Sequence, residues 1–498
     1  MTLNQTTPLS LDATTGTSTA SECTDLGPHE NSAVAVSQGT KAVDWNGPKD
    51  PENPYNWPQS KKIVHVIIVS LFSLNANLAA TMFAPGAEQL ATEFRITDPT
   101  IEAFTVSIYV LGFAVGPIFL APLSELYGRL VIYHVCNIFY TGFTIGCAFS
   151  TNVAMFLVFR ILCGIAASGP MSIGGGTIAD ITPQEERGKA IALFGIGPLL
   201  GPVIGPIIGG FVTQDIGWRW TFRIILILSS LLAIATAIFM RETNATVLLR
   251  RKAQRRVKET GNQSPATIHA APSKIFRTSI VRPAKMLIFS PIILLLSLYN
   301  GTVFGLIFLL FTTFPLVFEG TYGFSSGTAG LTYLGLGIGL ISGLVLFGTL
   351  SDKLLGQKRD GIVANPEQRL ILMKWFAPIT PLGCFLYGWT AEKHVHWIVP
   401  LIGTFIIGLG SLFVVIPAQT YLVDAFGPEA AASALAANLI VRSPFGAFLV
   451  LAAPSLYANL GLGWGNSVLG FITLAFTPVP WLFYRYGEAL RNRFPLEL

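Results

Sequence analysis

Charged residues are scarce in this chain. Only 12% of its 498 residues are Asp, Glu, Lys or Arg, and 51% are hydrophobic. A typical soluble protein has about a quarter of its residues charged. A soluble globular class is therefore excluded, and an integral membrane protein is indicated. The net charge of +5 does not indicate a nucleic-acid partner, because the basic residues are confined to particular loops.

Cysteine and histidine are also few, with five and six copies in the whole chain. Their spacing matches neither a disulfide framework nor a metal site, so we expect no metal and no other cofactor. The sequence contains no G-x-x-x-x-G-K-[ST] motif, which disfavours a pump driven directly by a nucleotide. No paired carboxylates or nucleophile elbow are found, so a membrane enzyme is disfavoured as well.

Long apolar stretches are abundant. Twelve of them reach the roughly 20 residues needed to cross a bilayer, and they begin near residues 62, 101, 130, 154, 189, 219, 286, 326, 371, 397, 430 and 464. We expect an all-α membrane protein with one six-helix bundle over 62–240 and a second over 286–487. Residues 1–61, rich in Thr, Ser, Asn, Gly and Pro, are expected to form a disordered tail. Residues 488–498 are expected to form a short cytosolic tail.

The two expected bundles are separated by a basic stretch, 241–285. It holds eleven Lys and Arg against two Glu. Short loops rich in Lys and Arg stay in the cytosol, so an even number of spans places both termini there too. We interpret the stretch as a solvated connector, with contact to anionic lipid at most.

One apolar run combines a glycine repeat with a proline repeat: Gly197, Pro198, Gly201, Pro202, Gly205, Pro206, Gly209 and Gly210. Glycine at every fourth position leaves one side of a helix bare, so another backbone can approach closely. Each proline removes a backbone donor, which a membrane helix tolerates where neighbours satisfy the freed carbonyls. The run is either a well-packed membrane helix or a bent helix at the moving interface of a transporter. We favour the second interpretation.

Two arginines lie inside predicted spans, where a central arginine costs about 2.5 kcal/mol or more. Arg160 in the fourth span is therefore expected to face a polar cavity or a partner. The alternative is that it reaches the outer interface. Arg442 in the eleventh span either lines the cavity or anchors the cytosolic end of its helix. The other candidate cavity residues are polar groups within spans: Asn75, Asn77, Asn137, Tyr299, Asn300 and Asn438.

No acidic residue lies in the middle of any predicted span. Proton-coupled carriers usually need a titratable group at that depth, so the sequence leaves the proton carrier unassigned. With so few charges in the candidate cavity, a lipophilic and weakly polar substrate is favoured, because buried unpaired polar groups would penalise it.

A tight turn between the second and third spans holds Glu125, Gly128 and Arg129. A carboxylate at such a turn can cap a helix N-terminus and pair with a base across the bundle interface. We interpret this turn as a latch of an inner gate. The alternative is a set of ordinary loop charges that enforce topology. Candidate partners, and the counterpart in the second half, are Asp180, Arg187 and Asp352.

Several short sequence motifs resemble those of a known family: D-P-E-N-P-Y-N-W-P (50–58), F-R-I-L-C-G (159–164), G-P-V-I-G-P-I-I-G-G (201–210) and W-R-W-T-F (218–222). From about residue 44 onward the chain resembles the major facilitator superfamily, in particular its fungal twelve-span drug:H+ antiporter branch. The resemblance implies two six-helix bundles that rock around a central cavity, with Arg160 tied to proton coupling.

That resemblance also implies a function. The expected activity is export of a small lipophilic drug, toxin or secondary metabolite in exchange for protons. The protein would act as a monomer in the plasma membrane, with the lipid bilayer and its small substrate as partners and no nucleic acid. An uptake carrier of the same fold and a non-transporting membrane receptor are the alternatives.

Overall fold

The regular structure of the chain is helical. The computed structural model describes residues 44–183, 187–260, 272–356 and 366–493, and no strand occurs within these ranges. The all-α fold class predicted from the sequence is confirmed.

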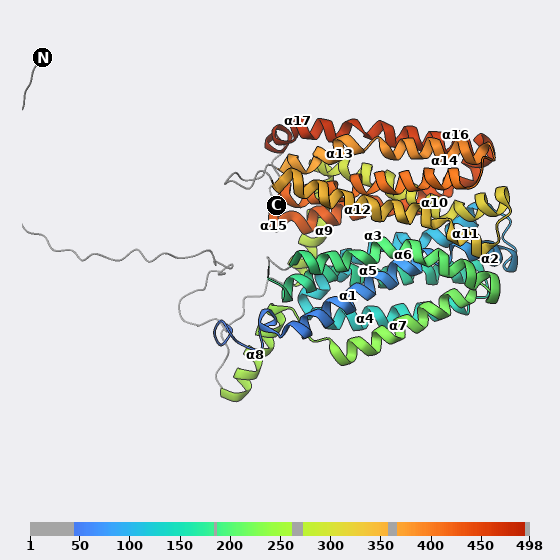
Figure 1. Cartoon of the computed structure of the whole chain (residues 1–498). Coiled ribbons are helices and arrows are strands. Elements are labelled where there is room, and N and C mark those ends of the chain that lie inside the picture. Colours follow the sequence, from blue (N-terminus) through green and yellow to red (C-terminus); the bar gives the residue numbers. More distant parts are fainter. Residues whose placement is uncertain (1–43, 184–186, 261–271, 357–365, 494–498) are drawn as a thin grey trace, which may run out of the picture. The chain divides into compact units, whose positions relative to one another are not determined.

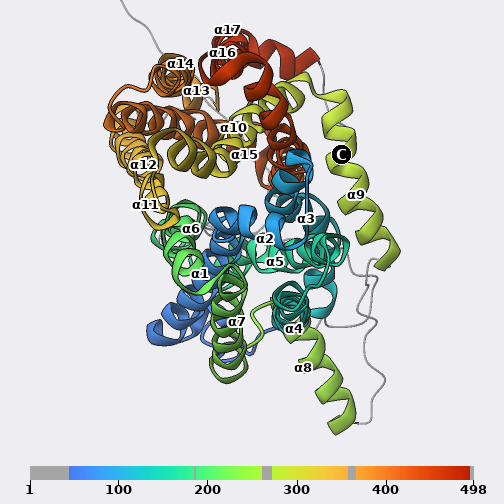
Figure 2. The same cartoon turned by 90° about the vertical axis from the view of Figure 1, so that its right-hand side faces the viewer.

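Six long helices form the first half, and each is long and apolar enough to cross a membrane. They are α1 (Gln59–Thr81), α3 (Pro99–Tyr127), α4 (Arg129–Ala148), α5 (Val153–Ile181), α6 (Arg187–Ile216) and α7 (Arg219–Phe239). In the end-on view of Figure 2, these blue-to-green helices form one group and the yellow-to-red helices of the second half form another.

The second half repeats this arrangement. Its helices are α10 (Pro291–Tyr322), α12 (Tyr333–Gly356), α13 (Leu370–Phe376) with α14 (Ile379–Glu392), α15 (Ile398–Phe448), and α16 (Ala453–Phe476) with α17 (Pro478–Arg493). Gly427 in α15 and Gly461 in α16 have positive φ, at 71° and 72°, and each marks a turn between two spans. Eleven stretches of the described residues qualify as spans, and the last, Ser433–Arg493, crosses the Gly461 turn. The twelve-helix architecture expected from the sequence therefore fits.

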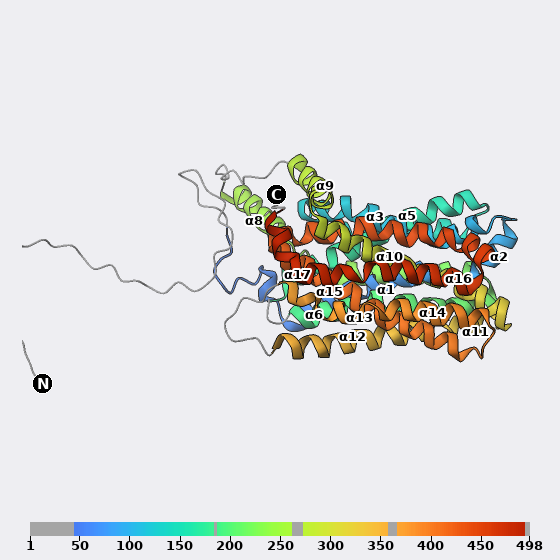
Figure 3. The same cartoon turned by 90° about the horizontal axis from the view of Figure 1, so that it is seen from above.

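Short helices distinguish the two ends of the bundle (Figure 1). One end carries α8 (Ala245–Thr260) and the last turn of α17, and we call it the basic end. The opposite end carries α2 (Ala87–Glu93) and α11 (Ser326–Leu331). The basic stretch is thus largely helical, because α8 and α9 (Pro272–Phe289) occupy most of it. Helix α9 lies along the outside of α3 and α15 (Figures 2 and 3).

Residues 44–58 correct the predicted disordered tail. The Tyr55 hydroxyl donates to the carbonyl of Ala179 in α5 at 3.0 Å. Asp50, only 4% exposed, pairs with Lys252 of α8 at 2.7 Å. The prediction of disorder is wrong for this segment, because its polar groups find partners on two helices. Residues 1–43 lie outside the described part of the chain.

The glycine face of α6 packs against α1. A Cβ at Gly209 would lie 1.9 Å from the carbonyl oxygen of Met82, and one at Gly197 would lie 2.5 Å from the Leu74 nitrogen. Gly201 and Gly205, which lie between these two glycines, contact the same stretch of α1. Helix α6 stays continuous through its three prolines. The bare face therefore brings two backbones into contact, as membrane helices with small-residue seams do.

Another strip of α6 contacts the second half near the opposite end. A Cβ at Gly210 would lie 2.5 Å from the carbonyl oxygen of Ser326 in α11. The Gln214 side-chain oxygen accepts a hydrogen bond from the Gly327 nitrogen at 3.0 Å. By contrast, most side chains of residues 191–198, nearer the basic end, are exposed. The two halves therefore meet along α6 near the opposite end, whereas nearer the basic end most residues of α6 outside its seam with α1 are exposed.

We expect Gly209→Ala to destabilise the protein by at least about 1–3 kcal/mol, because its Cβ would overlap backbone atoms of Met82 that cannot move independently. The measurement is the thermal midpoint of the detergent-solubilised full chain, followed by fluorescence-detected size exclusion. Gly195→Ala is the matched control on the same helix, since a Cβ there meets nothing within 4 Å. Equal thermal midpoints for the two variants would contradict the close approach of Gly209 to the Met82 backbone.

Candidate functional site

Arg160 is enclosed within the first half. It is 1% exposed, and its guanidinium donates to the carbonyl oxygens of Ala79 at 3.1 Å, Thr105 at 3.3 Å and Val106 at 3.2 Å. The Tyr109 ring centre lies 4.8 Å from its Cζ. The side chain does not reach the outer interface, so that alternative is wrong. Its partners are backbone carbonyls of α1 and α3, and none of the ion pairs among the described residues includes it.

A buried polar chain joins α10 and α15 in the second half. Asn300 donates to the side-chain oxygen of Asn438 at 3.4 Å, and Asn438 donates to the Ser297 hydroxyl at 3.4 Å. Arg442 lies one turn further along α15, with its Cζ 4.9 Å from the ring centre of Phe304. Its Nε is buried without a hydrogen-bond partner. Among the described residues the guanidinium makes no hydrogen bond and no ion pair.

The contacts of Arg442 do not offset the free-energy cost of placing its charge in a membrane helix. A cation over an aromatic face contributes up to about 2 kcal/mol when desolvated. An arginine at the centre of a membrane helix costs at least about 2.5 kcal/mol, before any unmade hydrogen bonds are counted. The Phe304 contact alone therefore leaves the charge of Arg442 partly unbalanced.

The remaining cavity candidates do not surround the same site. Asn75 and Asn137 border a small cavity of about 10 Å³ in the first half, with room for about one water. The Cβ of Asn77 lies in the seam between α1 and α6. The Tyr299 ring stacks on Phe476 at 5.5 Å between ring centres. The structure thus divides the predicted cavity lining into separate groups in the two halves.

A larger cavity of about 240 Å³ lies between α3, α9 and α15. Its walls are mainly aliphatic side chains and prolines, among them Pro117, Leu439 and Ile440. Glu125, near the basic end, is the charged residue among those that line it. It is exposed and forms no ion pair with a described residue. The side chains of Arg187 and Asp352, the other two gate candidates, lie outside the described residues.

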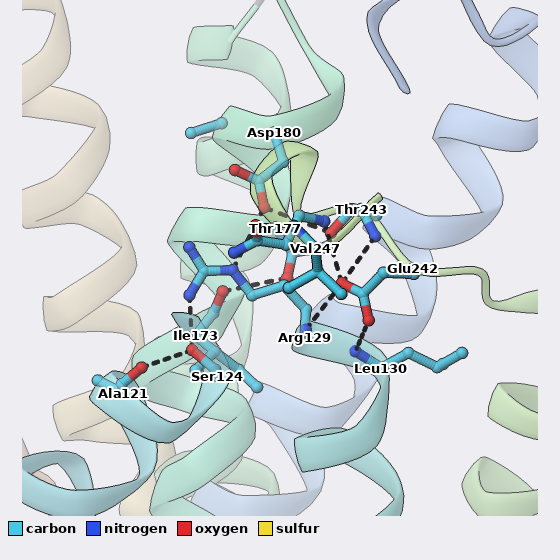
Figure 4. Close-up of polar contacts among 12 residues, drawn as sticks. Ala121, Ser124, Arg129, Leu130, Ile173, Thr177, Asp180, Glu242, Thr243 and Val247 are labelled. Atoms are coloured by element: carbon cyan, nitrogen blue, oxygen red, sulfur yellow. Dashed lines mark hydrogen bonds and ion pairs between the residues drawn. The ribbon is translucent and has the colours of Figure 1, made fainter. Parts of the chain in front are cut away.

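Arg129 ties three helices together at the basic end (Figure 4). Its Nε donates to the Asp180 carboxylate at 3.2 Å, and its Nη1 donates to the Ser124 hydroxyl at 2.6 Å. Asp180 also accepts from the Thr243 hydroxyl at 3.4 Å. The start of α4 is thereby fixed to the ends of α3 and α5. Of the two partners that the sequence offered for this turn, the structure brings Asp180 to Arg129.

Glu242 provides the helix cap that the sequence analysis assigned to Glu125. Its carboxylate accepts the backbone N–H of Arg129 at 2.8 Å and of Leu130 at 3.3 Å, where the α4 dipole is positive. Gly128, at φ 105°, makes room for it, because a Cβ there would lie 2.2 Å from the Glu242 oxygen. Gly128 is the residue before α4 and has no side chain to cap the helix. That is the signal in the sequence that the cap comes from elsewhere in the chain.

The second half has its own ion pair at this end, which the sequence analysis missed. Arg369, directly before α13, pairs with Asp424 at 2.7 Å. Asp424 ends the first part of α15, just before the Gly427 turn. These places correspond to Arg129 at the start of the third span and Asp180 at the end of the fourth. The internal repeat, and not the residue type alone, is the signal that could have found the pair.

The segment before α1 is fastened to the basic end by charge. Lys252 and Asp50 are 8% and 4% exposed. The hydrogen bond from Lys252, with backbone hydrogen bonds from Asn46 and Glu52, lowers the pKa of Asp50 to about 2. A second pair, Arg255 with Glu52 at 3.7 Å, is largely exposed and is expected to contribute little.

Solved structures share this fold. A D-xylose-proton symporter matches with a TM-score of 0.66 at 17% identity, covering 84% of this chain and 97% of its own. A bacterial homolog of the human lysosomal transporter Spinster matches with a TM-score of 0.62 at 16% identity, covering 89% and 100%. At these identities the likeness shows the fold alone. The architecture is that of two six-helix bundles whose helices are long enough to cross a membrane.

Sequence comparison then gives the family. The Major Facilitator Superfamily matches over residues 69–451. The chain is 71% identical over 459 residues to the MFS transporter fsa7 of Fusarium sp., covering 92% of this chain and 90% of that relative. It is 64% identical over 461 residues to the Trichosetin biosynthesis cluster MFS transporter of Gibberella fujikuroi, with the same two coverages. The chain belongs to the Major Facilitator Superfamily, a family of transporters and not of enzymes.

We expect Lys252→Gln to release residues 44–57, seen as faster backbone hydrogen exchange in the full chain at neutral pH. Arg255→Gln is the matched control and should change little, because its pair is exposed. The folded pKa of Asp50 lies below the ordinary aspartate pKa of 3.8. The contact therefore stabilises the protein fully above pH 3.8, and this contribution is lost as pH falls through about 2. Protection in the wild type should therefore be constant between about pH 8 and pH 5. Loss of protection within that range would contradict the assignment.

Proposed function

We propose that this protein exports a small lipophilic compound from the cytosol by alternating access. The observation that carries the proposal is the asymmetry of α6. It contacts the second half near the opposite end, through Gly210 and Gln214, whereas most side chains of residues 191–198, nearer the basic end, are exposed. Such an arrangement belongs to a carrier open on one side, in which the two bundles rock about a central pathway.

The basic end is proposed to face the cytosol, so that this state is open inward. Support comes from the Lys and Arg of residues 241–285, which favour the cytosolic side. The segment before α1, which Asp50 ties to α8, and the last turn of α17 both lie at that end (Figure 1). We place the protein in the plasma membrane and treat it as a monomer.

The substrate class is supported by the cavity and by the relatives. The 240 Å³ cavity has mainly aliphatic walls, which suit an apolar body. One relative is named for a biosynthesis cluster. A transporter that accompanies a biosynthetic route can remove its product, so a secondary metabolite is favoured over a nutrient.

The basic-end cluster is proposed to act as an inner gate. Arg129, Asp180 and Glu242 hold the ends of α3, α4 and α5 as one rigid unit. Glu125 and Ser433 line the same cavity, across the interface between the halves. When the halves close at this end, Glu125 can approach the first turn of the second part of α15. A carboxylate at that position is favoured by the helix dipole.

Exchange for protons, as in the drug:H+ antiporter branch, completes the proposal. Arg160 would tune the coupling by holding α1 and α3 to α5 through their carbonyls. The proton carrier is not assigned. An uptake carrier would move the same compounds inward under an imposed pH gradient, and a receptor would produce no substrate-dependent proton movement in vesicles.

We expect yeast that lacks its own drug pumps, and expresses this chain, to retain less of some lipophilic dyes or antifungals. Retention is measured across a panel, with and without a protonophore. Arg160→Ala should reduce export to near background, because three buried carbonyls lose their donor and α1 is no longer tied to α5.

Arg223→Ala, compared at matched surface expression, is the control. Arg223 also lies on a membrane helix, but it only stacks on Trp220 at 4.8 Å and is partly exposed. Export that survives in Arg160→Ala would make Arg160 structural. Export that survives the protonophore would contradict proton coupling. No export of any dye or antifungal by the wild type would contradict export of drug-like compounds.

A further inference from the structure

Arg442 stands near the middle of the membrane. The second part of α15 begins after the Gly427 turn, and the following turn is at Gly461. At 1.5 Å per residue, Arg442 lies roughly 20 Å from the first turn and roughly 30 Å from the second. Anchoring the cytosolic end of its helix, the alternative left open by the sequence, is incompatible with that depth.

Arg160 and Arg442 differ in what surrounds them: Arg160 is 1% exposed, whereas Arg442 is partly exposed with its Nε buried. Arg160 has three backbone carbonyls as acceptors. Arg442 has one aromatic face and no acceptor among the described residues, although a guanidinium offers five N–H donors. Buried oxygens without donors, on Asn300 and Ser443, occur on the same two helices. This region therefore combines an unpaired cation with unpaired polar groups.

The apolar cavity begins one helical turn from this cation. Leu439 and Ile440 line it, and Arg442 follows on the same helix. Glu125, the acidic residue that lines the cavity, lies at the end of the cavity nearer the basic end of the bundle. Arg442 itself is not among the residues that line the cavity, because its guanidinium lies over Phe304 of α10. The two sites are neighbours along α15, and the unpaired positive charge lies deeper in the span than the cavity.

We propose that the transported compound is a lipophilic organic anion, whose charged head pairs with Arg442 beside the Phe304 ring. This inference rests on the proposed export function and specifies its substrate class. An anionic oxygen group supplies the charge-assisted hydrogen bonds that Arg442 lacks. An acidic residue in the middle of these spans would compete for Arg442, which gives a reason for the absence of one.

The test compares one probe in two charge states. The full chain in lipid nanodiscs is titrated with 11-(dansylamino)undecanoate and with its methyl ester, and dansyl fluorescence reports binding. The wild type should bind the carboxylate at least about 10-fold more tightly than the ester. Arg442→Gln should lower the carboxylate affinity to that of the ester, and Arg442→Lys should keep a clear part of the preference.

Arg223→Gln is the matched control and should keep the full preference, since Arg223 lies away from this cavity on α7. Unchanged ester affinity in Arg442→Gln shows that the apolar part of the binding site is intact. If the Gln variant fails to fold, the acid-over-ester preference of Arg442→Lys is compared with that of the wild type instead. Equal binding of acid and ester by the wild type, or a preference that survives in Arg442→Gln, overturns the proposal. If the protein exports dyes but lacks this preference, the export function stands and the anion proposal fails. If it shows the preference but exports nothing, the anion proposal stands and the export function fails.

Discussion

The contact between the glycine face of α6 and the end of α1 sets how the first half is built. Gly197 to Gly209 place the two backbones so close that no side chain fits between them. Because α6 then also meets α11 through Gly210, it serves as the shared wall between the halves at the opposite end. A helix with large side chains on either strip would hold these elements further apart. The asymmetry that indicates a one-sided opening therefore follows from small residues on two strips of one helix.

The charged residues at the basic end have a different role from the glycine seam. They fix the positions of helix ends and contribute little to the free energy of unfolding. The Arg129–Asp180 pair is partly exposed, at 13% and 24% of its side chains, and such pairs typically contribute less than about 1 kcal/mol. Its value is geometric: one guanidinium and the Glu242 carboxylate set the positions of three helix termini. The Arg369–Asp424 pair occupies the corresponding place in the second half. Rigid units of this kind are what a rocking mechanism requires.

Much of the fold could be predicted from the sequence, because membrane spans follow from hydropathy and length. The turn at Gly461 is close to the expected start of the last span at 464. The glycine spacing of α6 correctly predicted a close backbone approach, but which helix approaches is a tertiary property with no local signal. The acceptors of Arg160 were not predictable either, since backbone carbonyls of Ala79, Thr105 and Val106 leave no trace in residue type. The segment around Asp50 looked disordered by composition, and its buried ion-pair partner, Lys252, lies 202 positions later in the sequence.

Arg160 and Arg442 looked alike in sequence, and the structure separates them by their acceptors. A cation already satisfied by carbonyls is suited to holding helices together, whereas one without an acceptor is suited to binding a ligand. If that ligand is an anion, its export from a cytosol at negative potential is favoured by about 2.3 kcal/mol per charge for each 100 mV. The driving force would then reside partly in the substrate's own charge, and each proton entering would add to it. A mid-membrane carboxylate is consequently less necessary for export of an anion than for export of a neutral compound or a cation, which reconciles an antiporter-like helix α6 with spans that lack central acids.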